Sequence, residues 1–514
     1  MPLSRRTFLL TASGAVALGA FPAARTLGQP RFTAYPFTLG VASGYPRPDG
    51  FVVWTRLAPE PLAGGGMPRE PVRVDWEVAA DESFQKIAAR GTAIASPEYA
   101  HSVHAEVTGL ASGRWYAYRF HSGGAVSPVG RTRTAPAATA PVDRMRFAIA
   151  SCQQYEQGYF AAYRHMAAED LDLVVHLGDY IYESSWGRRH VRRHEGPEPV
   201  TLAEYRNRHA LYKTDPDLKA AHAAFPWLVT WDDHEVQNDY AGDFGQERVP
   251  PELFRKRRLA AYQAYYEHMP LPAAARPRGG EMRIYAQSAF GTLARFFVLD
   301  DRQYRSPQAC PRPGRGGSNI VETCAERNDP RRTLLGTAQE RWLIEGLSAS
   351  PARWNLIAQQ TLMAQLDRLA GDGQTFWTDG WDGYPIARRQ LLAHVRDRRV
   401  ANPVVLSGDL HVAMVADLHV EFDDARAPAI ATEFVGTSIS SEGPARRRVE
   451  AWVAENRHIK YADPTRRGYT ALEVSGRRCL AHFRTLDDVR DPESRIRTLV
   501  SFATEDGRAG AQRV

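Results

Sequence analysis

Acidic residues, histidines and a cysteine follow several apolar runs of this sequence at the point where each run ends. The run VVHL (174–177) ends in Gly178-Asp179, with a tyrosine three positions after the aspartate. A buried carboxylate is costly unless a positive group holds it, so Asp179 is either a turn residue or a metal ligand. Four runs end in this way, and the residues that follow them are Cys152; Asp179 and Tyr182; Asp232, Asp233, His234 and Glu235; and Asp409 and His411.

Carboxylates, an imidazole, a phenol and a thiol together make up the donor set of a metal site. Each residue alone also has an ordinary explanation. Asp179 could shape a turn, Cys152 could be a small buried hydrophobe, and Asp232 or Asp233 could cap a helix. Tyr182 could be core and His411 a structural histidine. The occurrence of all of them after separate apolar runs favours a metal site.

The elements that must position these residues alternate between strands and helices. Apolar runs such as MRFAIASC, LDLVVHLGD, PWLVTWDD and NPVVLSGDLH are separated by helical stretches, a pattern that predicts an α/β domain with central β-sheets flanked by helices. In open α/β sheets the carboxyl ends of the strands converge on a ligand crevice. We therefore expect the polar residues after these runs to meet.

The segment before this domain has a different pattern. Short runs rich in aromatic and β-branched residues, such as FVVWTRL and WYAYRF, predict a small all-β, fibronectin-like sandwich. The Ala- and Pro-rich stretch 133–143 is typical of a linker. The predicted organisation is residues 31–138 for the sandwich and residues 139–514 for the α/β domain.

Composition sets limits on function. The 514 residues are 43% hydrophobic and 24% charged, with a formal net charge of +6 and no strong basic block. These values are typical of a globular protein of two domains. Spread charge of this size is a weak argument for nucleic-acid binding, so no specific nucleic-acid recognition is expected.

The first 30 residues predict an export signal. Arg5 and Arg6 precede a modest apolar run, Phe8 to Phe21, which is too short to remain as a membrane span. The arginine pair favours the twin-arginine pathway over an ordinary secretory signal, with cleavage between Ala23 and Gln29. We expect a periplasmic or secreted protein with no transmembrane segment after the signal is removed, and the twin-arginine export machinery as its partner.

Export has two chemical consequences. The twin-arginine route carries folded proteins, which suits a cofactor inserted before export. In an oxidising compartment Cys310 and Cys324, which bracket the loop CPRPGRGGSNIVETC, are expected to pair.

The motifs GDYIYE, TWDDHEVQND and SGDLHVA, with FTLGVASG upstream, resemble those of the alkaline phosphatase D (PhoD-like) family. These phosphodiesterase/phosphatases belong to the calcineurin-like metallophosphoesterases, and the resemblance covers nearly all of the chain after the signal. The family has Ser-Cys, here Ser151-Cys152, where most metallophosphoesterases have Asp-x-His. The resemblance implies a metallophosphoesterase fold for residues 139–514.

The Gly-Asp-x-x-Tyr spacing also resembles that of purple acid phosphatases, in which the aspartate bridges two metals and the tyrosine binds a ferric ion. Carried over, this implies Fe³⁺ on one side of Asp179 and one or two Ca²⁺ ions on the other, because hard oxygen donors favour calcium over zinc. The implied ligands are Cys152, Asp179, Tyr182 and His411 for iron; Asp233 and Asp409 for calcium; Gln359 as a further ligand; and Asn238 for a second calcium ion.

The implied activity is hydrolysis of phosphate mono- and diesters at alkaline pH by a metal-activated hydroxide. His234 is placed to bind the phosphoryl group or to protonate the leaving oxygen, and Arg302 to stabilise negative charge. Alternatively, His234 is a structural histidine and Arg302 lies on the surface. Two other functions stay open: a phospholipase D-type phosphodiesterase on the same scaffold, and a non-catalytic binding protein.

Overall fold

The computed structural model describes residues 32–514, and the predicted export signal lies outside them. A ten-stranded mixed sheet forms the first of two large sheets, in the order β24-β23-β22-β21-β9-β10-β11-β1-β2-β5. Its central strands β9, β10 and β11 run parallel to one another. The strands are β1 (Val41–Arg47), β2 (Gly50–Arg56), β5 (Ser102–Val107), β9 (Arg144–Ala150), β10 (Leu173–Leu177), β11 (Pro226–Thr230), β21 (Gly468–Ser475), β22 (Arg478–Leu486), β23 (Ile496–Glu505) and β24 (Gln512–Arg513).

A seven-stranded sheet in the order β12-β13-β15-β17-β19-β18-β20 packs against the first. The facing sides of the two sheets share one apolar core, in which the rings of Phe147 and Phe296 meet edge to face at 5.1 Å. The strands are β12 (Ala286–Phe290), β13 (Ala294–Val298), β15 (Trp354–Ala358), β17 (Pro403–Ser407), β18 (Ala413–Leu418), β19 (Ala431–Val435) and β20 (Ile459–Asp463).

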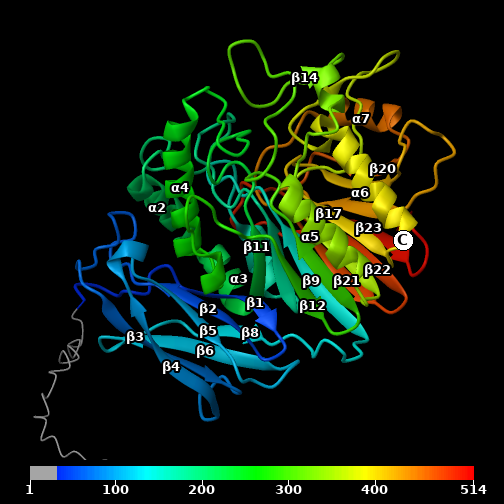
Figure 1. Ribbon diagram of the computed structural model, residues 1–514. Coiled ribbons are helices and arrows are strands. Elements are labelled where there is room, and N and C mark those ends of the chain that lie inside the picture. Colours follow the sequence, from blue (N-terminus) through cyan, green and yellow to red (C-terminus); the bar gives the residue numbers. More distant parts are fainter. Residues whose placement is uncertain (1–31) are drawn as a thin grey trace, which may run out of the picture.

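Helices cover the outer faces of both sheets (Figure 1). One group packs on the ten-stranded sheet and the other on the seven-stranded sheet, each through its own core. The central sheets flanked by helices that the sequence predicts are confirmed. The first group is α1 (Ala161–Ala167), α2 (Leu202–Lys213), α3 (Pro216–Ala224) and α4 (Pro251–His268), and the second is α5 (Gly336–Ser348), α6 (Pro385–Asp397) and α7 (Arg446–Glu455).

The N-terminal strands are divided between two sheets. Strand β1 pairs in parallel with β11, which extends the ten-stranded sheet through β2 and β5. The remaining strands form a separate antiparallel sheet that shares a core with β1, β2 and β5. The N-terminal segment is therefore joined to the central sheet by backbone hydrogen bonds. The separate sheet contains β3 (Val72–Ala79), β4 (Ile87–Ala95), β6 (Trp115–Ser122), β7 (Ala125–Val126) and β8 (Gly130–Arg133).

Helix ends follow from local sequence. Thr201 and Glu204 form a capping box at the start of α2, which satisfies two of the free N–H groups of its first turn. The Asp215 side chain caps α3, and Pro216 occupies its first turn. This sequence divides residues 202–224 into two helices.

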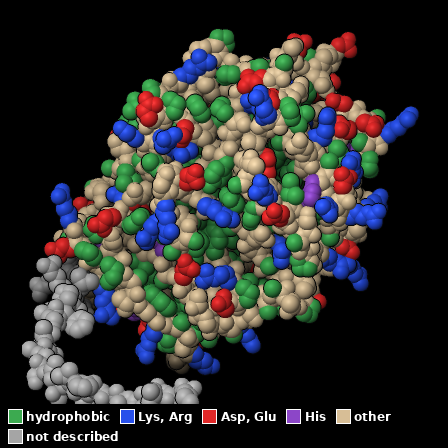
Figure 2. Space-filling view, in the orientation of Figure 1, with side chains coloured by type: hydrophobic (Ala, Val, Ile, Leu, Met, Phe, Trp, Pro, Cys, Tyr) green, Lys and Arg blue, Asp and Glu red, His purple; other side chains and the backbone are tan. Residues whose placement is uncertain are grey.

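The surface carries charges of both signs. Figure 2 shows acidic and basic side chains interspersed over the face that it draws, which is consistent with the small net charge of +6. Within residues 32–514, no helix is both long and apolar enough to cross a membrane.

Buried histidines between α2 and α4 make the stability of the fold depend on pH. His209 is fully buried, neither of its ring nitrogens has a hydrogen-bond partner, and its ring stacks on His268 at 5.1 Å. Burial, aided by the nearby Lys213 charge, lowers the pKa of His209 from 6.5 to about 3. Between pH 6.5 and pH 3, His209 is therefore protonated in the unfolded chain but not in the folded protein. The free energy of unfolding consequently falls as the pH falls from 6.5 toward 3.

Replacing this group should make the protein more tolerant of acid. Relative to the wild type, His209→Phe should gain about 2 kcal/mol between pH 8 and pH 5, since each pH unit below 6.5 corresponds to about 1.36 kcal/mol. Urea unfolding at a series of pH values measures this difference. The exposed His190 provides the control variant His190→Phe. Parallel pH profiles for His209→Phe and the wild type would show that His209 does not titrate in this way.

Candidate metal centre

The predicted site residues lie where strands of both sheets end. Cys152, Asp179 and Asp233 follow β9, β10 and β11 of one sheet, and His411 follows β17 of the other. Ligand atoms of Cys152, Asp179 and His411 all lie within 4.8 Å of one another, as do those of Asp179, Asp233 and His234. Asp179 belongs to both groups, which is the position that a bridging carboxylate requires.

The backbone at these residues is strained. Cys152, Asp179, Asp409 and His411 all have positive φ angles, between 55° and 61°. Non-glycine residues adopt this left-handed conformation at a cost of about 1–3 kcal/mol each, and such residues cluster at functional sites. The surrounding fold therefore holds four of the predicted ligands in conformations that the chain alone would avoid.

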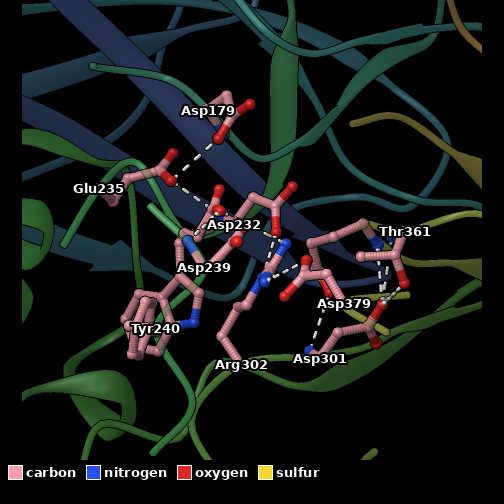
Figure 3. A network of polar contacts seen from close by, with 12 residues as sticks. Asp179, Asp232, Glu235, Asp239, Tyr240, Asp301, Arg302, Thr361 and Asp379 are labelled. Atoms are coloured by element: carbon pink, nitrogen blue, oxygen red, sulfur yellow. Dashed lines mark hydrogen bonds and ion pairs between the residues drawn. The ribbon is translucent and has the colours of Figure 1, made fainter. Parts of the chain in front are cut away.

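Glu235 holds the turn after β10 against the turn after β11. Its carboxylate accepts hydrogen bonds from the backbone N–H groups of Asp179 (3.2 Å), Tyr180 (2.6 Å) and Asp232 (2.9 Å), part of the network in Figure 3. Gly178 between them has φ +107°, and a Cβ there would lie 2.5 Å from the Cβ of Asp232. The glycine before Asp179 is therefore required for the close approach of the two turns.

Tyr182 and His411 lie on one side of Asp179. The Tyr182 hydroxyl is 2.9 Å from Asp179 Oδ2 and 3.1 Å from His411 Nε2, and it accepts a hydrogen bond of 2.9 Å from Ser441. His411 Nδ1 donates to the Glu442 carbonyl at 2.7 Å, and burial lowers the pKa of His411 to about 3. The imidazole is therefore neutral, with an Nε2 lone pair directed at the site.

Several buried oxygens of the site have no hydrogen-bond partner among residues 32–514. They include Asp179 Oδ1, Asp233 Oδ1 and Asp409 Oδ2. Burial raises the pKa of Asp179 and of the Cys152 thiol well above their usual ranges, and that of Asp409 to about 8. A bound cation would supply the missing partners and favour the ionised forms. The donor set therefore fits a metal centre.

His234 forms a buried ion pair beside this centre. Its Nδ1 lies 2.7 Å from Glu183 Oε2, and its ring packs on that of Tyr182 at 4.2 Å between centroids. Burial alone would lower the pKa of His234, but the carboxylates, Glu183 first among them, raise it well above its usual range. Burial raises the pKa of Glu183, but the charge of His234 and the hydrogen bonds from His234 and Asn238 together lower it to about 2. The ion pair therefore favours the protonated form of the His234 ring.

Arg302 is completely buried, so the alternative that it lies on the surface is wrong. Its Nε donates to Asp232, its Nη1 donates to Asp379 Oδ2 at 2.7 Å, and its Nη2 lies 3.7 Å from Asp233 Oδ2 (Figure 3). Nη2 has no hydrogen-bond partner among the described residues. Two of the three guanidinium nitrogens, Nε and Nη1, therefore bind buried aspartates, and the third, Nη2, faces the predicted ligand Asp233.

Comparisons with known proteins identify the family. The family model described as "PhoD-like phosphatase" matches residues 147–483, and the model described as its N-terminal domain matches residues 22–136. This chain belongs to the PhoD-like phosphatase family. The resemblance seen in the sequence is confirmed, and the mixed α/β fold is the one expected of the family.

Two relatives cover nearly the whole of this PhoD-like phosphatase. "Alkaline phosphatase D" of Bacillus subtilis (strain 168) is 47% identical over 495 residues, which are 94% of this chain and 83% of that protein. A solved structure described as "Structure of PhoD" is similar with a TM-score of 0.91 at 47% identity, over 94% of this chain and 93% of its own. The protein is a phosphoric ester hydrolase of the alkaline phosphatase D type.

The remaining predicted ligands have other surroundings in this phosphatase. The Gln359 amide accepts from Trp381 Nε1 at 3.0 Å and donates to Ser407 Oγ at 2.7 Å, so both of its ends are engaged by the protein. Asn238 is half-buried, and its backbone N–H donates to Glu183 at 2.8 Å. Neither side chain has a buried oxygen without a hydrogen-bond partner, which is the feature that marks Asp179 and Asp233.

The sequence did not single out a second acidic group beside Asp233. Ligand oxygens of Asp233, Asp239 and Asp379 lie within 4.8 Å of one another. Asp239 was visible only as the neighbour of Asn238, and its φ of +55° is a further strained position. Asp379 lies in the segment TFWTDGWDG, far from any predicted strand end. No local pattern marks it as part of the site.

Proposed function

We propose that this phosphatase is an exported alkaline phosphatase and phosphodiesterase that hydrolyses phosphate mono- and diesters at an iron–calcium centre. The observation that carries the proposal is the position of Asp179 in both ligand groups, with a partnerless buried oxygen. One side of Asp179 offers a thiol, a phenol and an imidazole, and the other offers the Asp233 carboxylate with the His234 ring beside it. This asymmetry favours two different metals.

The residues divide between the metals by donor chemistry. Cys152, Tyr182 and His411 would hold Fe³⁺, with Asp179 as the bridge, and the hard oxygens of Asp233 and Asp409 suit Ca²⁺. The group of Asp233, Asp239 and Asp379, with Asn238 beside it in sequence, is the place for a second calcium ion.

Bound metal ions would supply a hydroxide nucleophile at working pH and charge stabilisation for the phosphoryl oxygens. The chain itself would supply the proton for the leaving group. His234 is held by Glu183 at 2.7 Å and is 9% exposed, so the ring is fixed by the pair yet still reaches the surface of the site. Its raised pKa keeps it protonated toward alkaline pH, as a general acid requires.

Residues 1–30 are proposed to direct export by the twin-arginine route to the periplasm or the medium, on the evidence of Arg5 and Arg6. We retain residues 31–138 as an N-terminal sandwich domain and residues 139–514 as the catalytic metallophosphoesterase domain. The continuity of β1 with β11 supports a role for the N-terminal domain as a rigid support of the catalytic sheet.

The proposed chemistry predicts how His234→Ala responds to the leaving group. Turnover of alkyl phosphates and their diesters should fall about 10²–10⁴-fold, because a basic alkoxide needs a proton. Turnover of nitrophenyl phosphate should fall much less, since nitrophenolate leaves without one. A series of esters with graded leaving-group pKa measures the dependence for the wild type and the variant.

The matched control is wild-type protein stripped of metal, which should lose activity on every ester of the series and regain it with iron and calcium. Equal losses on all esters for His234→Ala would assign His234 to phosphate binding. Full activity in metal-free protein would contradict the proposed function itself.

A further inference from the structure

The loop between Cys310 and Cys324 is closed by a disulfide, as expected from the sequence. Ala309, Val321 and the two cysteines form a small apolar cluster of their own. The loop contains β14 (Ile320–Val321) and lies beside the helices of the seven-stranded sheet (Figure 1). The loop contains none of the predicted metal ligands, and none of its residues belongs to the apolar cores of the two large sheets. The role of the cross-link must therefore be sought elsewhere.

The loop holds Asp239 directly. Ser318 donates to Asp239 Oδ2 through its backbone N–H at 3.0 Å and also through its hydroxyl. Gly317, with φ +75°, allows the loop backbone to approach so closely that a Cβ would lie 3.1 Å from the Cβ of Asp239. Gln246, which also donates to Asp239 Oδ2, accepts at its carbonyl from the N–H of Gly316 at 2.8 Å.

The same loop holds the segment that carries Asp379. Strand β14 pairs antiparallel with β16 (Phe376–Trp377). Beside this pairing, the Thr378 N–H donates to the Asn319 carbonyl and the Asn319 N–H donates to Thr378 Oγ1, both at 2.9 Å. Asp379 is the next residue. Gln308, two positions before Cys310, donates to Asp379 Oδ1 at 2.8 Å and to the Asp239 carbonyl at 2.7 Å.

The cross-linked loop thus holds the Asp239 carboxylate directly and pairs with the backbone that leads to Asp379. The Asp379 carboxylate itself accepts from Arg302, Arg305 and Gln308. We propose that this loop sets the geometry of Asp239 and Asp379 beside Asp233, with Ser318 as a positioning residue, and that full calcium affinity requires the Cys310–Cys324 disulfide. The proposal rests on the proposed function, in which this acidic group binds calcium. Residues that orient metal ligands typically contribute about 10–100-fold to metal affinity.

The redox step balances as a thiol–disulfide exchange. The two cysteine thiols lose two electrons and two protons to form the bond, and a protein or small-molecule disulfide is reduced to two thiols. An enzyme folded in a reducing compartment and then exported would acquire its full calcium affinity only after arrival. The reduced loop would therefore keep the calcium affinity of the phosphatase low until the enzyme reaches an oxidising compartment.

The first test compares the wild type with the double variant Cys310→Ser, Cys324→Ser. Calcium is first removed with a calcium-selective chelator, and calorimetric titration then gives the Kd for calcium. The value of kcat is measured on nitrophenyl phosphate at saturating and at low calcium. The double variant should bind calcium about 10–100-fold more weakly. Saturating calcium should restore much of its kcat.

Reductant provides an internal control. A phosphine reductant should raise the number of thiols titrated in denaturant from the two free cysteines to all four and weaken calcium binding in the wild type. The same reductant should leave the double variant unchanged. An equal effect on both proteins would show that the reductant acts elsewhere, which would contradict the inference.

The second test leaves the disulfide intact, so it stands even where the double variant folds poorly. Ser318→Ala should weaken calcium binding about tenfold, the lower end of the effect of residues that orient metal ligands, and Ser318→Thr, which keeps the hydroxyl, should bind calcium as the wild type does. Ser348→Ala, at an exposed position of α5, is the matched control and should bind as the wild type does.

Different outcomes would contradict the proposed function and the role of the loop. Wild-type protein that binds no calcium would overturn the proposed function and this inference with it. The other outcome is that the wild type binds calcium and that Ser318→Ala and the double variant bind it equally tightly. This result would overturn only the role of the loop.

Discussion

Asp179→Asn should reduce turnover by about a thousandfold or more, at the upper end of the losses seen when one preorganised group is removed from a transition state. The reason is position, because Asp179 is the one carboxylate shared by both ligand groups. Asparagine is isosteric and tolerates the left-handed backbone of this residue, φ +55°. The fold should therefore survive, and steady-state kinetics together with thermal unfolding measure the two effects separately.

The control is Asp170→Asn, whose side chain is 77% exposed and pairs only with surface arginines. It should behave as the wild type in both measurements. Asp179→Asn with wild-type turnover and full metal content would refute the bridging role. A large loss of stability would mean that the kinetics cannot be assigned to the site, and Asp179→Glu, which keeps the charge, then decides whether activity follows the position of the carboxylate.

Arg302→Met should destabilise the protein by about 3–5 kcal/mol, the usual cost of leaving a buried charge without its partner. Arg302 is fully buried, and its removal would leave Asp232 without its arginine and Asp379 with Arg305 as its remaining arginine (Figure 3). Their charges would then repel each other next to Asp233. Urea unfolding of the purified variant measures the loss, and the midpoint should fall accordingly.

Arg302→Lys separates charge from geometry, because lysine keeps the charge but cannot reach two carboxylates with a planar fork. It should recover part of the stability and little of the activity. A surface pair, Arg353 with Asp506, provides the control Arg353→Met, which should cost less than about 1 kcal/mol. An Arg302→Met variant as stable as this control would show that the buried network contributes nothing.

The sequence predicted the residues that follow strands. Cys152, Asp179, Asp233 and His411 each interrupt an apolar run, and parallel strands bring such positions together at one edge. The sequence also predicted the alternation of strands and helices, because hydrophobic periodicity is local. Both predictions depend on patterns that span a few residues.

The supporting contacts could not be predicted in the same way. Glu235 and Arg302 act through hydrogen bonds to residues up to 77 positions away, and no local pattern encodes such a pairing. The parallel alignment of β1 with β11 joins segments about 180 residues apart. Likewise, the strained backbone at Cys152 and His411 follows from tertiary packing, since the residue types alone favour other conformations.

The central claim is that two chemically different metals lie on the two sides of Asp179. The most direct measurement is the metal content of the purified enzyme together with its visible absorption spectrum, for the wild type and for Tyr182→Phe. We predict bound iron and calcium, and a visible absorption band from phenolate and thiolate donation to ferric iron. Tyr182→Phe should shift or bleach this band without unfolding the protein. A colourless, iron-free enzyme that contains zinc and retains full activity would contradict the assignment of Cys152 and Tyr182.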